Sequence, residues 1–313
     1  MIVRPDTFEA MMLICFGCAW PISIYRTLKT KSAHGKSRWF LVVILLGYIS
    51  GILFEVTGDT SYRDFFDANY DQLHLFEWTF AYPFETEQQD LVLYYTTVPG
   101  ATASVANNII SVYEGAMDGS DNFRAFDGEA DPYLAHLADY VWGSNSTKAR
   151  KGLMMYALVT FDLYASRQAD AERAAERYVH YLHGVNPLGL VYLSNMGEFG
   201  AENSVNEFYH SWFTDGSERW DRVGTSTYGP APGFLTGGPN PSYSVDGCCP
   251  SGCGSPENNA LCSSEPLEPP LNQPAQKSYK DFNTSWPLNS WEVTENSNGY
   301  QVSYVRLLSK FVR

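Results

Sequence analysis

The sequence predicts an all-α protein, in which helices form an α/α toroid with long loops on one rim and follow a two-helix transmembrane hairpin. From residue 55 onward, apolar residues recur at helical spacing, without the sustained alternation typical of strands. The stretch between Pro187 and Trp291 is rich in Gly, Pro, Asn and Ser, which indicates a functional loop surface. Two apolar runs precede residue 55. We therefore expect a hairpin domain at residues 1–54 and a helical domain at residues 55–313.

The apolar runs of the predicted hairpin are Ala10–Tyr25 and Trp39–Phe54, each free of Asp, Glu, Lys and Arg. Crossing a membrane takes about 20 residues, close to the length of each run. The connecting segment Arg26–Arg38 contains five Lys and Arg residues, which predicts a cytoplasmic loop and an extracytoplasmic position for residue 55 onward. We expect membrane contact through residues 10–54. A buried helix pair in a soluble core and a cleaved signal peptide are the alternatives.

Composition narrows the classes of function. Apolar residues make up 44% of the 313 residues and aromatic residues 15%, which excludes a wholly disordered chain. The net charge of -14 argues against a nucleic-acid partner, because such proteins neutralise phosphates with clustered Lys and Arg. An uncharged ligand fits this charge better.

The clearest helix in the pattern is Ala169–His183, which is rich in helix formers and ends just before Gly184 and Pro187. It sets Ala171, Ala174, Ala175 and Tyr178 on one face. The remaining predicted helices are Asp59–Asn69, Gln88–Tyr95, Ser104–Ala116, Pro132–Trp142, Thr147–Ser166 and Tyr300–Lys310.

Four cysteines lie close together in the long loop: Cys248, Cys249, Cys253 and Cys262. Their crowding predicts two disulfides, in agreement with export from the cytoplasm. A zinc site is the alternative, but the paired Cys-x2-Cys spacing of zinc ribbons is missing.

The N-terminal residues carry a first resemblance. The stretch Ala19–Arg26, with Pro21 inside an apolar run, and the basic loop Lys31–Ser37 are similar to the PQ-loop and SemiSWEET families of small sugar transporters. A protomer of those families resembles a bundle of three helices, whereas this chain offers two. A plain membrane anchor is the other interpretation of residues 1–54.

The rest of the chain resembles the cellulases of glycoside hydrolase family 9. The resemblance rests on four motifs in the family's order, with the similar stretch Trp78–Glu85 upstream: Gly184–Gly189, Asn206–His210, Gly237–Asn240 and Trp291–Glu295. It implies an (α/α)6 barrel with a sugar cleft at one end, a β-glucan substrate and an inverting acid/base mechanism. Only the later part of that barrel is matched, so we expect a partial barrel that lacks its first helices.

Inverting glycoside hydrolysis needs an acid that protonates the leaving oxygen and a base that activates water. The resemblance places Glu295 as the general acid, four residues after the aromatic Trp291, with Glu292 as runner-up. A general acid needs apolar surroundings, which Trp291 and Tyr300 lie near enough in sequence to provide. Alternatively, Glu295 is an acidic partner of the following helix dipole.

The resemblance makes His210 the histidine that binds the sugar, with Tyr209, Trp212 and Trp291 as further substrate-binding residues. Flat aromatic faces suit the apolar faces of sugars, although core packing explains such a cluster equally well. Many members of the family carry an Arg where this chain has Trp212, so that one substrate contact differs.

The base is unassigned, because the family's Asp-Ala-Gly-Asp or Asp-Gly-Gly-Asp motif is missing. The nearest sequences, Asp118–Asp121 and the pair Asp127 and Asp131, are typical of turns or helix caps. No cofactor is required, but the resemblance makes a structural calcium ion plausible, with oxygens such as those of Asp127, Glu129 and Asp131.

The sequence thus favours a hydrolase of β-1,4-glucans, either membrane-anchored with residues 55–313 outside the cytoplasm, or secreted if the join near residue 55 is artificial. One alternative is a membrane protein whose sugar-transporter-like hairpin is joined to a non-catalytic remnant. Another is a module that binds glucan through Trp78, Trp212 and Trp291 without cleaving it.

Overall fold

The computed structural model describes residues 49–210, 213, 215–247, 249, 255–265 and 267–312. The chain divides into two compact units, Met1–Asn69 and Tyr70–Arg313. In the first unit, residues 49–57 are helical and are followed by α3 (Thr60–Asp67). The Asp59 side chain caps α3 by accepting a hydrogen bond from the Ser61 amide.

Most of the predicted hairpin lies in residues 1–48, outside the described residues. Among the helices that the structure does describe, none combines the length and the apolar character needed to span a bilayer. The two membrane helices, and the likeness to sugar transporters that rests on them, stay predictions.

The second unit is mainly helical, as the sequence predicts. Its α-helices are α4 (His74–Glu77), α5 (Thr86–Tyr95), α6 (Ala103–Met117), α7 (Phe123–Asp127), α8 (Ser144–Thr160), α9 (Gln168–Leu182), α10 (Pro256–Ser264), α11 (Trp291–Thr294) and α12 (Asn298–Leu308). Single 3-10 turns lie at Pro83–Glu85, Gly197–Phe199 and Ala275–Lys277. Two short parallel strands, β1 (Val191–Ser194) and β2 (Ser204–Val205), form a small sheet.

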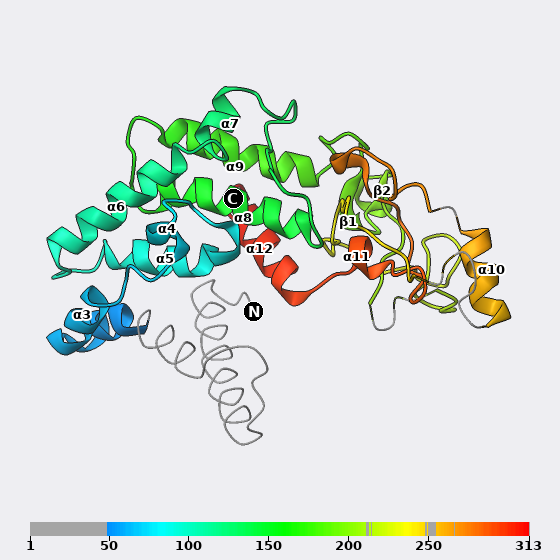
Figure 1. The fold of residues 1–313 in the computed structure, drawn as a ribbon, viewed down its shortest axis with the longest axis horizontal. Coiled ribbons are helices and arrows are strands. Elements are labelled where there is room, and N and C mark those ends of the chain that lie inside the picture. The colour runs from blue at the N-terminus through cyan, green and yellow to red at the C-terminus, as the bar shows by residue number, and fades with distance from the viewer. Residues whose placement is uncertain are drawn as a thin grey trace, which may run out of the picture. The chain divides into compact units, whose positions relative to one another are not determined.

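Helix α8 is the centre of this unit. It packs against α9 and α12 and also contacts α5, as Figure 1 lets the reader follow. Nearly every residue from Ser144 to Leu158 is buried, so α8 lacks the solvent-facing polar stripe of a surface helix. A buried hydrogen bond from the Tyr113 hydroxyl of α6 to the Met154 carbonyl, 2.8 Å long, ties a further helix to it.

One predicted helix does not form: the segment Pro132–Trp142 consists of turns and extended chain. The Asp131 side chain accepts a hydrogen bond from the Tyr133 amide at 3.0 Å, and Leu134 takes a positive φ of 55°. This local turn replaces the first helical turn. The predicted helix Thr147–Ser166 also ends early, because Asp162 and Tyr164 take positive φ angles of 53° and 46°.

The chain between Pro187 and Trp291 is mostly loop, as predicted, apart from β1, β2 and α10. In Figure 1 these loops and the small sheet gather beyond one end of the bundle formed by α8, α9 and α12. The motifs singled out in the sequence lie largely in this loop layer, so the long loops position the candidate site.

Candidate active site

Glu295 lies at the junction between two helices, as the C-cap of α11 and shortly before α12. Its Oε2 accepts a hydrogen bond of 2.9 Å from the indole Nε1 of Trp142, and its Oε1 lies 4.0 Å from Nε2 of His210. The Glu295 side chain is 26% exposed and that of His210 is 48% exposed. The structure thus brings together two residues that are 85 positions apart in the sequence, in a place that solvent can reach.

The alternative role of Glu295, as partner of the α12 dipole, does not match this geometry. The N-cap of α12 is Ser297, whose side chain accepts a hydrogen bond of 3.2 Å from the Tyr300 amide. The carboxylate of Glu295 turns to Trp142 instead. No sequence pattern indicated a role for Trp142 in the site, since this residue falls at the end of the segment predicted to be helical.

Aromatic rings surround this junction. The rings of Tyr209 and Trp291 lie 5.5 Å apart at an angle of 55°, so these two predicted substrate-binding residues are in contact. The Tyr300 hydroxyl lies close to Gly143, which has a φ of 81°. A Cβ added at Gly143 would lie 2.5 Å from this hydroxyl oxygen. Burial, helped by the negative charge of Glu295, raises the pKa of Tyr300 to about 12. Tyr300 is therefore a neutral hydroxyl near the carboxylate at neutral pH.

The motif Gly237–Asn240 holds the α11 segment in place. The Gly238 amide donates a hydrogen bond of 2.8 Å to the Val293 carbonyl, and the Asn145 amide of α8 donates one of 2.9 Å to the Gly237 carbonyl. Gly238 has a φ of 102°, and a Cβ there would lie 2.4 Å from the Asn145 side chain. A side chain at this position is excluded both by the backbone angle and by the close approach of α8.

Asn240 completes the attachment, because its Nδ2 donates a hydrogen bond of 3.1 Å to the Glu292 carbonyl. The Glu292 carboxylate faces a neighbouring loop, where it accepts a hydrogen bond of 3.0 Å from the Ser244 amide. The structure therefore joins Glu295, but not Glu292, to Trp142 and His210.

Two other motifs have mainly structural contacts. In Gly184–Gly189, Asn186 is buried, and its side chain donates to the Tyr181 and Leu190 carbonyls at 2.8 and 2.7 Å. In the upstream stretch, Trp78 stacks on His74 with 3.6 Å between ring centroids, and Glu85 accepts a hydrogen bond of 3.2 Å from the His74 amide. These bonds fix the chain direction after α9 and around α4.

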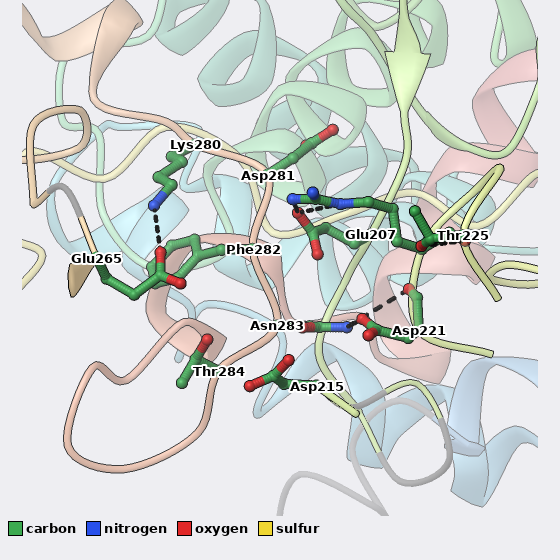
Figure 2. A pocket seen from close by; sticks show the side chains of 11 residues that line it. Glu207, Asp215, Asp221, Thr225, Glu265, Lys280, Asp281, Phe282, Asn283 and Thr284 are labelled. Carbon is green, nitrogen blue, oxygen red and sulfur yellow. Dashed lines mark hydrogen bonds and ion pairs between the residues drawn. The ribbon is translucent and has the colours of Figure 1, made fainter. Parts of the chain in front are cut away.

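A polar cavity of about 400 Å³ is lined in part by Glu207, which belongs to the same motif as His210. Figure 2 shows its lining, in which Glu207 pairs with Arg222, Glu265 pairs with Lys280 and Asp221 accepts a hydrogen bond from Asn283. The wall also includes Asp215, Thr225, Asp281, Phe282 and Thr284. Neither Glu295 nor His210 lines it. The ion pairs and hydrogen bond of its wall hold loop segments together, and the candidate acid lies outside the cavity.

Burial raises the pKa of three carboxyl groups of this cavity, those of Glu207, Asp215 and Asp281. The pKa of Glu207 is raised by burial, against the opposing effect of the Arg222 guanidinium. Burial raises the pKa of Asp281 to about 7, although its Oδ2 accepts a hydrogen bond of 2.9 Å from the Asn206 amide. Asp281 therefore titrates near neutral pH, a property that the sequence did not reveal.

The mid-chain aspartates are held by partners of their own. Asp118 accepts a hydrogen bond of 2.7 Å from the Tyr164 hydroxyl, and Asp121 accepts one of 3.1 Å from His136. Asp127 pairs with Arg167 at 2.8 Å, and the buried Asp131 lies 4.0 Å from the buried Lys148. These contacts tie the four aspartates to distant parts of the chain, and the catalytic base stays unassigned.

The proposed calcium ligands do not form a metal site. Asp127 and Asp131 face Arg167 and Lys148, as described above. Across the described part of the chain, no group of three or more His, Cys, Asp or Glu residues could hold a metal ion. A structural calcium ion held elsewhere stays a prediction.

Of the four crowded cysteines, Cys249 and Cys262 form a disulfide, which confirms one of the two predicted bridges. Cys248 and Cys253 lie outside the described residues, and so does Trp212. The second bridge and the role of Trp212 stay predictions.

Residues 48–306 match the family Glycosyl hydrolase family 9. The chain belongs to this family. The match begins near the predicted join at residue 55 and extends almost to the end of α12. A search of curated proteins found no match, and nothing in these comparisons supports the likeness of residues 1–54 to sugar transporters.

Solved structures share the fold of this family 9 chain. A single mutant of the thermostable endoglucanase from Alicyclobacillus acidocaldarius has a TM-score of 0.58 and 18% identity, covering 86% of this chain and 43% of that one. AaCel9A in complex with cellobiose-like isofagomine has a TM-score of 0.56 and 19% identity, covering 84% and 42%. A family 9 protein from Bacteroides ovatus has a TM-score of 0.51 and 19% identity, covering 84% and 39%. The chain thus spans less than half the length of each of these proteins.

Proposed function

We propose that this glycoside hydrolase acts on β-1,4-glucans, with Glu295 as the proton donor of an inverting mechanism. The observation that carries the proposal is the placement of Glu295, whose Oε2 is held by Trp142 while its Oε1 lies 4.0 Å from His210. The endoglucanases that share the fold support the substrate class.

In this mechanism, Glu295 protonates the oxygen of the leaving sugar while water attacks the opposite face of the ring. The Trp142 indole fixes one carboxylate oxygen, so the other is left to face the substrate. His210 binds a sugar hydroxyl beside the scissile bond, and the contacting rings of Tyr209 and Trp291 offer an apolar face to the sugar. The water-activating carboxylate comes from a residue still to be identified.

The disulfide supports a proposal about the compartment. A bridge between Cys249 and Cys262 persists in an oxidising environment, which supports an extracytoplasmic position for residues 55–313. Anchoring through residues 10–54 is part of the same proposal.

The test is the release of reducing ends from soluble β-1,4-glucan by the full chain purified in detergent, compared with Glu295→Gln. We expect the variant to lose about 100-fold or more in rate, since general acid catalysis contributes about 10²–10⁴-fold. Glu292→Gln is the matched control and should stay within about threefold of the parent. Equal rates for the parent and Glu295→Gln would rule out the assigned acid.

A second candidate is glucan binding without cleavage. Each of the mid-chain aspartates, the nearest sequences to the missing base motif, is already engaged by a partner such as His136 or Arg167. This favours binding without cleavage, because cleavage needs a carboxylate that activates water. If the parent chain releases no reducing ends but its migration is slowed by soluble glucan in a gel, this second function is the correct one.

A further inference from the structure

A groove of about 670 Å³ lies in the loop layer, lined by two separate parts of the chain. One part runs from Asn195 to Phe199 and the other from Val223 to Pro232. None of the residues that line it also lines the polar cavity of Glu207, and Glu295 is not among them. The groove is therefore a separate feature, to which neither the motifs nor the acid site assigns a role.

Two aromatic side chains stand exposed along this groove. Phe199 is 68% exposed and Tyr228 is 61% exposed, with the partly exposed Val223 beside them. The Tyr228 ring packs against Trp220 with 4.9 Å between centroids and 33° between planes. Trp220 in turn contacts Phe213 at 6.3 Å. Tyr228 is thus the exposed end of a row of three aromatic residues, in which Trp220 packs against its ring and Phe213 packs against Trp220.

Hydrogen bonds hold the walls of the groove in position. The Asn195 side chain donates to the Tyr228 and Pro230 carbonyls at 3.3 and 2.8 Å, which ties one wall to the other. Within the second wall, the Tyr228 amide donates to the Arg219 carbonyl at 2.9 Å, and Ser226 accepts from the Gly229 amide at 3.1 Å. A surface that is ordered before binding loses less entropy when a ligand arrives.

The chemistry of the lining fits a sugar chain. Apart from Glu198, the side chains that line the groove are uncharged, and they mix aromatic faces with hydroxyl and amide groups. A β-linked glucan presents the same mixture, with apolar C–H faces that stack on aromatic rings and equatorial hydroxyls along its edges. An uncharged ligand also suits a chain of net charge -14.

We propose that this groove, which we call the Phe199–Tyr228 groove, is a non-catalytic binding site for a segment of β-glucan chain. This inference rests on the proposed substrate class. The groove holds a part of the polymer that is not being cleaved, so it raises affinity for long chains and leaves the chemistry at Glu295 unchanged.

The experiment separates binding from cleavage by using Glu295→Gln as the parent in every measurement. The dissociation constant for soluble hydroxyethylcellulose is measured by affinity electrophoresis, with full chains in detergent. Tyr228→Ala and Phe199→Ala are each added to this parent. Phe65→Ala is the matched control, because Phe65 is an exposed aromatic residue of α3 and does not line the groove.

We expect each groove substitution to weaken glucan binding by about tenfold, as removal of a well-placed aromatic anchor commonly does. Phe65→Ala should bind as the parent does, and the melting temperatures of all variants should match. Unchanged glucan affinity in both groove variants would overturn the proposal. So would a change of oligomeric state in sedimentation without loss of glucan binding, because the groove would then be an interface between copies of the chain.

The groove and the proposed hydrolase function fail in different ways. If the wild-type chain releases no reducing ends but Tyr228→Ala and Phe199→Ala still lose glucan affinity, the groove stands and cleavage does not. If the wild-type chain cleaves glucan while the groove variants bind as the parent does, the hydrolase function stands and the groove proposal is wrong.

Discussion

Helix α8 holds charged side chains inside the helical bundle, whereas the loops that carry Glu295 are held by uncharged groups. In α8, the buried Lys148 donates to the Ala135 carbonyl and lies 3.8 Å from the centre of the Tyr181 ring. Lys151 donates to the Asp121 carbonyl and the Asn122 side chain, both at 2.6 Å. Around Glu295, backbone amides and Asn side chains make the attachments instead.

The difference shows two ways of fixing an irregular segment. The two lysines bind the segment from Asp121 to Ala135, which includes part of the predicted helix that does not form. Burial of a cation is costly, and it lowers the pKa of Lys148 to about 7 and that of Lys151 to about 8. The attachments of the α11 segment avoid this cost, because neutral groups lose less hydration energy than charged groups on burial. Changes in α8 should therefore act on stability, and changes near Glu295 on activity.

The largest expected effect on stability is that of Lys148→Ala. The substitution leaves Asp131 buried without its cation, so we expect a loss of about 3–5 kcal/mol in the free energy of unfolding. Chemical denaturation followed by circular dichroism measures it. Lys148→Met combined with Asp131→Asn is the control and should recover most of the loss, since neither charge is then buried. A loss below about 1 kcal/mol for Lys148→Ala would show that the buried cation does not hold this segment.

Gly238→Ala should have an intermediate effect. The new Cβ would overlap the Asn145 side chain at a positive φ, so we expect a loss of about 1–3 kcal/mol and a displaced α11 segment. Activity should fall along with the melting temperature, in contrast to the α8 variants. Gly247→Ala, in open space in the same loop layer, is the control. If Gly238→Ala melts and cleaves like the parent, the motif does not position Glu295.

Trp142→Phe should reduce the rate of glucan cleavage by about tenfold, through the loss of one hydrogen bond to the carboxylate. The ring is kept, so stability should change by less than about 0.5 kcal/mol. Because Trp142 orients Glu295, kcat should fall while KM stays constant. A fall in rate caused only by a higher KM would instead indicate that Trp142 binds substrate.

The smallest expected effect is the pH dependence of stability, where the two regions oppose each other. Asp281 has a folded pKa raised from 3.8 to about 7, so the folded state binds more protons between these values and stability falls as pH rises through them. Lys148 has a folded pKa lowered from 10.5 to about 7, so the unfolded state binds more protons above pH 7 and stability rises with pH.

These opposite slopes, each at most about 1.4 kcal/mol per pH unit, predict a stability minimum near pH 7. Denaturant unfolding at intervals between pH 5 and pH 9 measures it. Asp281→Asn should reduce the fall in stability below pH 7 only. Lys148→Met should reduce the rise in stability above pH 7 only. A single maximum near pH 7 in the parent would contradict both assignments.

Much of the helical framework could be predicted from the sequence. The predicted helix Ala169–His183 matches α9 (Gln168–Leu182) to within one residue at each end, because its face of small apolar residues and the Gly184 that follows are local signals. A disulfide among the four crowded cysteines was also within reach of the sequence, because such crowding favours bridges, but the pairing of Cys249 with Cys262 was not.

Contacts between distant residues decided the rest. The bond between Trp142 and Glu295 joins residues 153 positions apart, and no local pattern carries that information. Pro132–Trp142 has the composition of a helix, yet the Asp131 turn and the bond from Lys148 to Ala135 hold it in another form. The sequence by itself determined the helices, the loop layer and the family motifs, because these depend on local spacing. Only the tertiary structure decided how Glu295 is held and which charges are buried, because both depend on groups that packing brings together.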